Sequence, residues 1–131
     1  MDVATMMERQ KYITVETYKR DGTPVRTPVW FHVRDGQVIV VTRSETGKAK
    51  RLRANNRVRI APCTIRGRVK GPWASGGAAI LDGEQTDAAV KARDKKYGMM
   101  ARLARSLTGG KGELFAFAIK LDGAHDDAKS T

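Results

Sequence analysis

Two Asp-Gly pairs divide the first third of the chain into three short runs of alternating side-chain character. Asp-Gly supplies the positive backbone angles of a two-residue hairpin turn, so each pair reverses the direction of a strand. The pairs are Asp21-Gly22 and Asp35-Gly36, and they separate residues 11–18, 25–34 and 37–42. Alternation with a period of two is typical of a strand that buries one face. We therefore predict three strands in an antiparallel meander.

The remainder of the chain predicts further strands and two helical regions. Strands are expected over residues 57–64, within 68–81 and over 113–121, and helices over 44–56 and 84–107. Gly98 is placed to interrupt the second helix, residues 3–10 can form a short leading helix, and residues 108–112 form a glycine-rich loop. Because the strands arrive mostly as hairpins, six or seven of them favour a small antiparallel barrel with flanking helices over βαβ units.

Pro28 disturbs the second predicted strand. It lacks the N–H that a strand donates to its neighbour, so it indicates a sheet edge, a bulge or a kink. Such an irregularity lets a ligand approach the backbone, and it also occurs for purely structural reasons.

Length and composition limit the classes of protein to consider. With 131 residues the chain has the size of one domain, and we predict a domain over residues 1–122 followed by a disordered tail over 123–131. No apolar stretch approaches the ~20 residues of a membrane span, and the opening residues do not resemble a secretory signal. We therefore expect a cytoplasmic protein that does not enter the membrane.

Metal and nucleophilic chemistry find little support in the sequence. The single cysteine, Cys63, excludes an internal disulfide and a multi-cysteine zinc site, and on a Val/Ile-rich strand it is typical of a packing residue. The only histidines are His32 and His125, so no His-rich metal site is expected. Nucleotide-binding and hydrolase motifs are also absent. The sequence therefore favours a binding protein, or an enzyme whose chemistry belongs to a cofactor.

Positive charge is concentrated in one block of the sequence. The chain has 25 Lys and Arg against 14 Asp and Glu, a formal net charge of +11. Residues 43–70 contain ten of the basic residues and only one acidic residue, Glu45. Such a segment attracts nucleic acid, an anionic membrane surface or a phosphorylated small molecule, although a solvated basic face is the simpler alternative.

The start of the first predicted helix has the composition of an anion site. Ser44 or Thr46 can cap the helix, Gly47 allows close approach to the backbone, and the first turn offers free N–H groups. Lys48 and Arg51 are three residues apart and therefore share one helix face, where both can hold one phosphate. Basic helices with capped starts also occur as plain surface.

Several short segments, in this order, resemble a known family. They are Thr27-Pro28-Val29-Trp30-Phe31, Val40-Val41-Thr42, Ser44-x-x-Gly47-Lys48-x-x-Arg51-Leu52, Asn55-x-Arg57-Val58-x-Ile60-Ala61-Pro62-Cys63 and Lys96-Tyr97-Gly98. Together they resemble the split β-barrel flavin and deazaflavin proteins related to pyridoxamine 5′-phosphate oxidase, and within them the small actinobacterial oxidoreductases that depend on coenzyme F420. The resemblance implies a six-stranded antiparallel split β-barrel with flanking helices (the FMN-binding split barrel), and a homodimer with two cofactor sites at its interface.

The same resemblance implies which residues bind the cofactor. The phosphate and acidic tail are expected on Ser44, Gly47, Lys48 and Arg51, with Lys50 and Arg57 as neighbours. The ring is expected along Pro28, Val29 and Trp30 and beside Val41, Thr42, Pro62 and Cys63, with Trp73 closing the pocket from the partner chain. Coenzyme F420 carries a phosphodiester and a polyglutamyl tail, which suits a basic groove. FMN has only a compact phosphate and is the alternative.

The implied activity is hydride transfer from the reduced deazaflavin to an electron-poor small molecule, such as a conjugated carbonyl, a quinone or a tetrapyrrole like biliverdin. Tyr97 and His32 are the candidates for a proton donor. The alternatives are an FMN-dependent enzyme like pyridoxamine 5′-phosphate oxidase, a cofactor carrier without turnover, and a nucleic-acid-binding barrel. The last has less support, because only Trp73 lies near the basic block to stack on bases.

Overall fold

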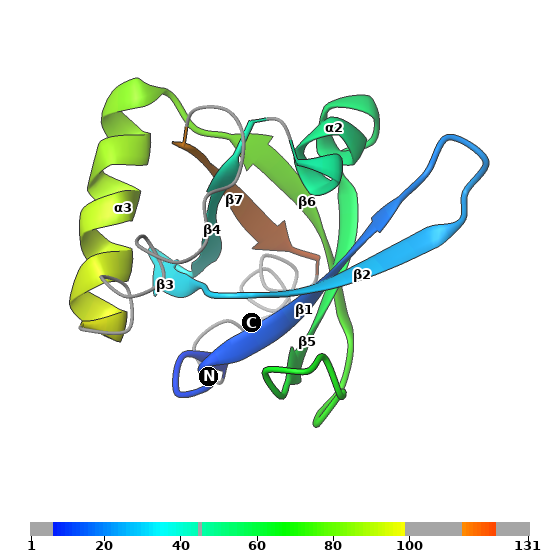
Figure 1. Cartoon of the computed structure of the whole chain (residues 1–131), viewed down its shortest axis with the longest axis horizontal. Coiled ribbons are helices and arrows are strands. Elements are labelled where there is room, and N and C mark those ends of the chain that lie inside the picture. Colours follow the sequence, from blue (N-terminus) through cyan, green and yellow to red (C-terminus); the bar gives the residue numbers. More distant parts are fainter. Residues whose placement is uncertain (1–6, 45, 99–113, 123–131) are drawn as a thin grey trace, which may run out of the picture.

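The first predicted hairpin is present, and it begins a strongly curved sheet (Figure 1). The structure is a computed structural model that describes residues 7–44, 46–98 and 114–122. Strand β1 (Tyr12–Tyr18) pairs antiparallel with β2 (Pro24–Val29), and Glu16 lies opposite Arg26. Ile13 and Val15 are fully buried, as the alternation predicts.

The second predicted strand is divided in two, so the predicted meander is present only as two separate hairpins. Strand β2 ends at Val29, and β3 (His32–Arg34) pairs with β4 (Gln37–Arg43) instead of continuing along β1. The backbone groups of Phe31 explain the break, because they bond to side chains near the end of a helix. The hydroxyl of Tyr97 accepts from the Phe31 N–H at 3.0 Å, and Lys96 donates to the Phe31 carbonyl at 2.9 Å. Neither backbone group is then free for a strand ladder.

The sheet order shows how the barrel closes. Its seven strands follow the order β2-β1-β5-β6-β7-β4-β3, and all neighbours are antiparallel. Strands β2 and β3 stand at opposite ends of this order, yet they are joined through Trp30 and Phe31 alone. The sheet must therefore curl until its two edges meet at this connection, which gives a split barrel. The expected barrel is confirmed, and its seven strands lie within the six or seven that the sequence predicts, one more than the resemblance implies.

The remaining strands complete the wall and its core. They are β5 (Arg57–Cys63), β6 (Ala74–Ile80) and β7 (Leu114–Leu121), each within a segment where the sequence predicted a strand. Their inward residues form one apolar core with those of β1 and β4, and the largest fully buried members include Phe117, Ile60 and Ile119. Gly76 is needed at the β6–β7 contact, because a Cβ there would lie 2.6 Å from the carbonyl oxygen of Lys120.

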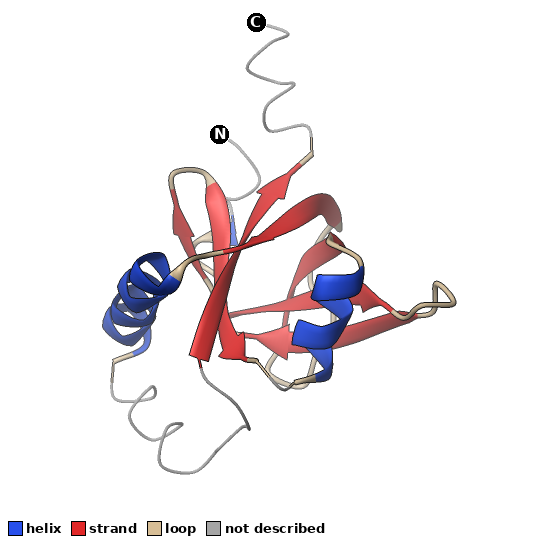
Figure 2. Ribbon diagram, turned by 90° about the horizontal axis from the view of Figure 1, so that it is seen from above, coloured by secondary structure: helices blue, strands red, loops and turns tan. Residues whose placement is uncertain are grey.

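Two helices lie on opposite sides of the barrel (Figure 2). Helix α2 (Gly47–Ala54) inserts Leu52 into the core, so it covers one end of the barrel. Helix α3 (Gly83–Tyr97) begins with a capping box between Asp82 and Gln85 and ends at Gly98, whose φ of +56° suits glycine. It packs on the outer face of β4 and β7, where its Ala89 joins Ile39 and the small residues of β7.

Three predicted features fall wholly or largely outside the described residues. They are the extension of the second helix over 99–107, the loop over 108–112 and the tail over 123–131, and most of the leading helix within 3–10 is also outside. Among the helices that the structure describes, none is long and apolar enough to cross a bilayer.

Candidate functional site

Thr46, and not Ser44, caps helix α2. Its hydroxyl accepts from the N–H of Ala49 at 3.2 Å and donates to the carbonyl of Arg43 at 3.0 Å. It also lies 3.4 Å from the hydroxyl of Thr42, so the end of β4 and the start of α2 form one local unit. No acidic residue occupies the first turn of the helix. The positive end of the helix dipole is therefore left without a negative partner in that turn.

Arg51 is folded back over the start of its own helix. Its Nε donates to the hydroxyl of Thr17 at 2.6 Å, and Thr17 is fully buried in β1. A Cβ at Gly47 would lie only 2.8 Å from an Nη atom of Arg51, so the guanidinium occupies the space that glycine leaves. Gly47 and Arg51, which the sequence predicts for the same anion site, are therefore in contact. The Arg51 guanidinium thus lies beside the free N–H groups of the first turn, so that both can donate to the same anion.

Lys48 lies beside this guanidinium in a poorly solvated position. Burial, and then the positive charge of Arg51, lower the pKa of Lys48 to about 8. No acidic side chain among the described residues pairs with either cation. A bound anion would relieve both the repulsion and the desolvation. The cluster of Gly47, Lys48 and Arg51 at the start of α2, which we call the α2 cluster, therefore has the charge and geometry of a phosphate site.

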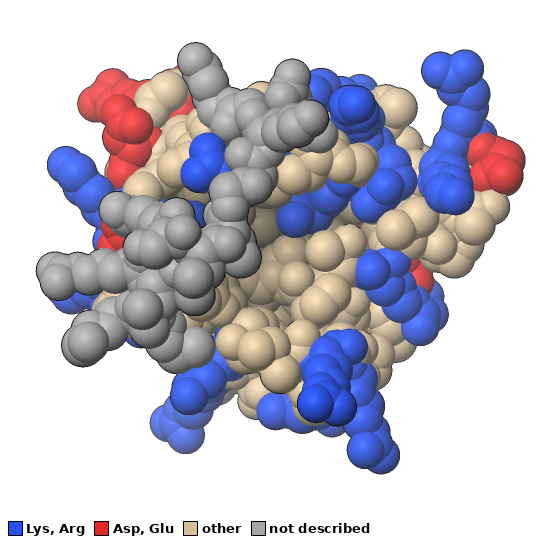
Figure 3. Space-filling model, in the orientation of Figure 1, with Lys and Arg blue, Asp and Glu red and all other residues tan. Residues whose placement is uncertain are grey.

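The basic block of the sequence does not form one surface. In Figure 3, Lys and Arg gather over α2 and the β1–β2 hairpin, and a second group lies at the bottom of the view. Strand β5 separates α2 from the loop that carries Arg66, Arg68 and Lys70, and seven strand residues span roughly 20 Å. Within the block, Arg57 pairs with Asp122 and Arg59 with Glu16. Fewer cations are therefore left for one anion than the sequence count implies.

The residues predicted to bind the cofactor ring are not all close to the α2 cluster. Thr17, which holds Arg51, faces inward on β1, whereas Pro28 pairs with Thr14 and lies on the other face of the same sheet. Cys63 is also on that outer face and is buried, which raises the pKa of its thiol. Thr42 is linked to the start of α2 through its contact with Thr46.

The Trp30 and Trp73 rings both contact other side chains of the same chain. The Trp30 ring stacks on Tyr97 with centroids 4.4 Å apart and planes 9° from parallel. The Trp73 ring contacts the guanidinium groups of Arg26 and Arg59, at 4.7 and 4.6 Å from its centroid. These two arginines also bind the buried carboxylate of Glu16. Trp73 thus covers an ion-pair cluster on the outer face of the barrel.

The two candidate proton donors lie away from the α2 cluster. The hydroxyl of Tyr97 accepts from Phe31 N–H and donates to the carbonyl of Lys11 at 2.7 Å, and burial raises its pKa to about 12. His32 is buried on β3 beneath α3, and burial together with Lys96, Arg34 and Arg93 lowers its pKa to about 4. The Tyr97 hydroxyl is therefore hydrogen-bonded to backbone groups, and the His32 imidazole is neutral at physiological pH. Among the described residues, no group of three or more His, Cys, Asp or Glu side chains could hold a metal ion.

Sequence reasoning missed two residues that organise these sites. Thr17 shares the buried face of the first predicted strand with Ile13 and Val15, and a polar residue on such a face is a signal for a buried hydrogen bond. Glu16 alternates along β1 with the residues of the core, yet it too is buried, between Arg26 and Arg59. The signal for this buried ion pair is the presence of two basic residues opposite Glu16, Arg26 on β2 and Arg59 on β5.

Comparison with known proteins agrees with this architecture. The chain resembles the heme storage protein HutZ from Vibrio cholerae, with a TM-score of 0.68 and 14% identity over 93% of this chain and 89% of that one. It also resembles an F420 reductase, with a TM-score of 0.61 and 14% identity over 94% and 95% of the two chains. A heme-binding protein from Mycobacterium smegmatis gives a TM-score of 0.66 and 14% identity over 90% of this chain and 49% of that protein. Identities this low show the fold alone.

No curated protein sequence matches the chain. In contrast, a family-wide sequence pattern matches residues 2–122, which is nearly the whole of it. The match includes every strand of the barrel and both described helices. The chain therefore belongs to the pyridoxamine 5′-phosphate oxidase family.

Proposed function

We propose that the protein binds coenzyme F420 through the α2 cluster and, as a homodimer, reduces an electron-poor small molecule with the hydride of the reduced cofactor. One observation carries the proposal. Lys48 and Arg51 converge on the start of a helix, and no acidic partner lies among the described residues. Such a site fits the phosphodiester of the coenzyme.

The details of the α2 cluster support a phosphate in particular. The guanidinium of Arg51 is held by Thr17, so little side-chain freedom is lost when an anion binds. Because Gly47 has no side chain, the Arg51 guanidinium can lie against the first turn of the helix, where a phosphate would meet both. Lys50 is exposed on the same helix and can accompany the acidic tail of F420. The compact phosphate of FMN would also fit the cluster, so FMN remains the competing cofactor.

A homodimer would explain why the predicted site is divided. The α2 cluster is linked through Thr17 to one face of β1, while Pro28 and Cys63 lie on the other face. A second copy of the chain can bring its own outer face to the cluster, and the ring would then lie between the two chains. Exposed Ile65 and Ile80 offer apolar surface for such an interface.

The proposed chemistry divides between cofactor and chain. When bound, the reduced deazaflavin supplies the hydride. Lys48 and Arg51 bind the phosphate, and the barrel wall orients the ring and limits its contact with water. Because Tyr97 is engaged with backbone and His32 lies beneath α3, we propose that the accompanying proton comes from solvent.

Nucleic acid is a less suitable ligand for this surface. The Trp73 ring already contacts the guanidinium groups of Arg26 and Arg59, which leaves less of it to stack on a base. The cations also separate into two groups along β5. A steep loss of RNA or DNA affinity with salt, combined with no binding of F420 or FMN, would favour this alternative.

The first experiment is a fluorescence titration of the purified protein with F420 and, separately, with FMN. We expect tighter binding of F420 and a loss of at least about tenfold in the Lys48→Ala/Arg51→Ala variant, since two charge-assisted contacts are removed. The charge-matched control is Lys91→Ala/Lys95→Ala on the exposed face of α3, and circular dichroism reports the fold of both. Unchanged affinity in the first variant refutes the site, and a preference for FMN refutes the cofactor.

A pH series adds a second criterion. Because the pKa of Lys48 is lowered to about 8, the free ammonium is lost as the pH rises through 8, and phosphate binding should weaken there. Lys48→Ala should remove this dependence. Turnover is then tested by oxidation of reduced F420 with a panel of enones, quinones and biliverdin, and binding without oxidation would identify a carrier.

A further inference from the structure

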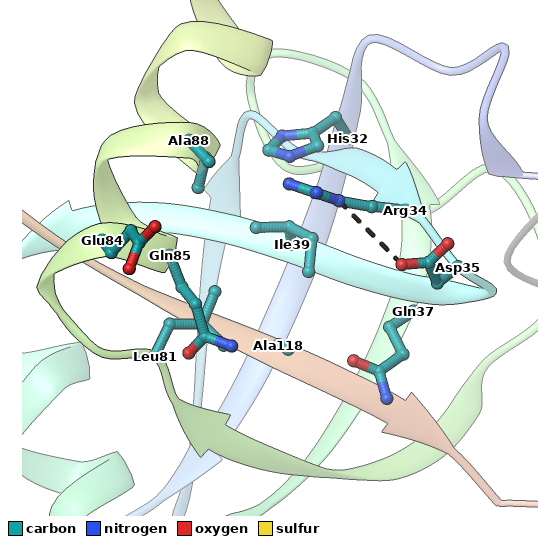
Figure 4. A pocket seen from close by; sticks show the side chains of 11 residues that line it. His32, Arg34, Asp35, Gln37, Ile39, Leu81, Glu84, Gln85, Ala88 and Ala118 are labelled. Atoms are coloured by element: carbon teal, nitrogen blue, oxygen red, sulfur yellow. Dashed lines mark ion pairs between the residues drawn. The ribbon is translucent and has the colours of Figure 1, made fainter.

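A cavity of about 320 Å³ lies on the outer face of the sheet, beneath helix α3 (Figure 4). It is formed by β3 and β4, β7 and the first two turns of α3, and it does not include the α2 cluster. Its lining includes His32, Arg34, Ile39, Leu81, Ala88 and Ala118. The volume lies at the lower end of the ~300–1,000 Å³ that small-molecule sites occupy.

His32 is the polar group that this cavity leaves unsatisfied. The residue is only 7% exposed, and neither ring nitrogen has a hydrogen-bond partner in the described structure. Buried polar side chains almost always have a partner, and leaving one without costs about 1–3 kcal/mol. The lowered pKa keeps the imidazole neutral, so it offers one N–H donor and one acceptor.

Arg34 places a positive charge next to this imidazole. Figure 4 shows its guanidinium lying alongside the His32 ring, toward the cavity. Its link to Asp35 is long, at 3.9 Å, and its side chain is 62% exposed, so the ion pair is weak and can be exchanged for a ligand. Lys96 and Arg93 add positive potential around His32. The upper part of the cavity therefore favours an anion.

The rest of the cavity has a different character. Ile39, Leu81 and Ala118 provide an apolar floor, and Ala88 leaves space under the helix. Glu84 and Gln85 lie at the start of α3, away from His32. The Gln85 side-chain oxygen already accepts from the Asp82 N–H at 3.1 Å, so the Glu84 carboxylate is the acceptor at this end. A ligand would thus meet a cationic end, an apolar middle and an accepting end.

We propose that this cavity binds a small organic acid, with its carboxylate between the His32 imidazole and the Arg34 guanidinium and its apolar body on Ile39, Leu81 and Ala118. A hydroxyl or amino group at the far end of the ligand would donate to Glu84. The proposal is independent of the cofactor site. It needs neither F420 nor a second chain, because every lining residue belongs to one barrel and one helix.

The test uses benzoate as the probe and benzamide as its neutral counterpart of the same shape. In the ¹⁵N-labelled protein of 131 residues, NMR follows the His32 ring nitrogens, with His125 as the second histidine for comparison. We expect benzoate to shift the His32 signals saturably, and benzamide to bind at least about tenfold more weakly because it lacks the charge. No saturable shift, or equal binding of the two probes, overturns the proposal.

Variants then locate the probe. Ala88→Leu fills the cavity and should abolish the benzoate shifts, whereas Ala92→Leu, one turn further along α3 and outside the lining, should leave them unchanged. Arg34→Gln serves as a second variant because its exposed side chain is not needed for the fold, and it should weaken benzoate about tenfold. Retention of binding in both Ala88→Leu and Arg34→Gln refutes the assignment. Affinity that is lost in Lys48→Ala/Arg51→Ala but kept in Arg34→Gln places the anion at the α2 cluster instead.

Discussion

Replacement of Glu16 by Gln should destabilise the protein by an amount that depends on pH. The Glu16 carboxylate is 2% exposed and accepts hydrogen bonds from Arg59 at 2.8 and 3.1 Å and from Arg26 at 2.9 Å. The Tyr18 hydroxyl donates a further bond at 2.8 Å. Gln has the same shape but no charge, so the variant removes the ion pairs and keeps the packing.

The expected magnitude follows from the pKa of the carboxyl group. Hydrogen bonds from Arg59, which outweigh the opposing effect of burial, and those from Arg26 lower the pKa of Glu16 from 4.5 to about 2. A shift of that size corresponds to about 3 kcal/mol of stability at neutral pH. Because the side chains of Arg26 and Arg59 are 54% and 38% exposed, water screens the pairs and reduces this to about 1–2 kcal/mol.

The sign of the pH dependence is fixed by the direction of the shift. A depressed carboxyl pKa stabilises the fold fully above the unfolded value of 4.5, and this stabilisation is lost as the pH falls toward 2. Urea unfolding at pH 7 and pH 3 measures it. Wild type should lose about 1 kcal/mol more than Glu16→Gln over this interval, and the exposed control Asp87→Asn should behave as wild type. Equal losses in wild type and Glu16→Gln would refute the reasoning.

Two further substitutions test the hydrogen bonds that organise the ends of the barrel. Thr17→Val removes the acceptor of the Arg51 Nε, and we expect phosphate-bearing cofactors to bind about fivefold more weakly in a fluorescence titration while the urea midpoint changes little. Unchanged cofactor affinity would mean that Thr17 does not position Arg51. Tyr97→Phe leaves the buried N–H of Phe31 without its acceptor and should cost about 1–3 kcal/mol in urea unfolding, whereas Tyr12→Phe should cost much less. Equal effects of the two tyrosine variants would contradict this role for Tyr97.

The sequence predicts individual strands of this barrel better than their pairing. Alternation and Asp-Gly turns are local signals, and the hairpin of β1 and β2 and that of β3 and β4 both follow from them. The break at Phe31 depends on Tyr97 and Lys96, which are more than sixty residues away in the chain. No local pattern contains that contact. A continuous strand over 25–34 is therefore the natural prediction, and the meander follows from it.

The candidate site shows the same division between local and distant information. The cap, the glycine and the two cations of the α2 cluster lie within six residues, so their sequence pattern predicts a local anion site. Thr17 enters from another strand and was not recognised. The ring residues are spread over three strands and two faces of the sheet, and spacing along the chain cannot report which face each one occupies. A family resemblance can name such residues, but it cannot assign them to one chain or to its partner.

The basic residues of this chain fall into two classes, those that bind a carboxylate of the same chain and those that do not. Arg57 and Arg59 each bind a carboxylate of the same chain, so their charge is already used in holding strands together. Lys48 is held in a desolvated position beside another cation, which lowers its pKa and opposes folding. A fold tolerates that arrangement most readily when a ligand supplies the missing charge, because binding then recovers the cost. We therefore expect a phosphate-bearing cofactor to raise the free energy of unfolding of the wild type, measured by urea unfolding without turnover. The cofactor should not raise it in Lys48→Ala/Arg51→Ala.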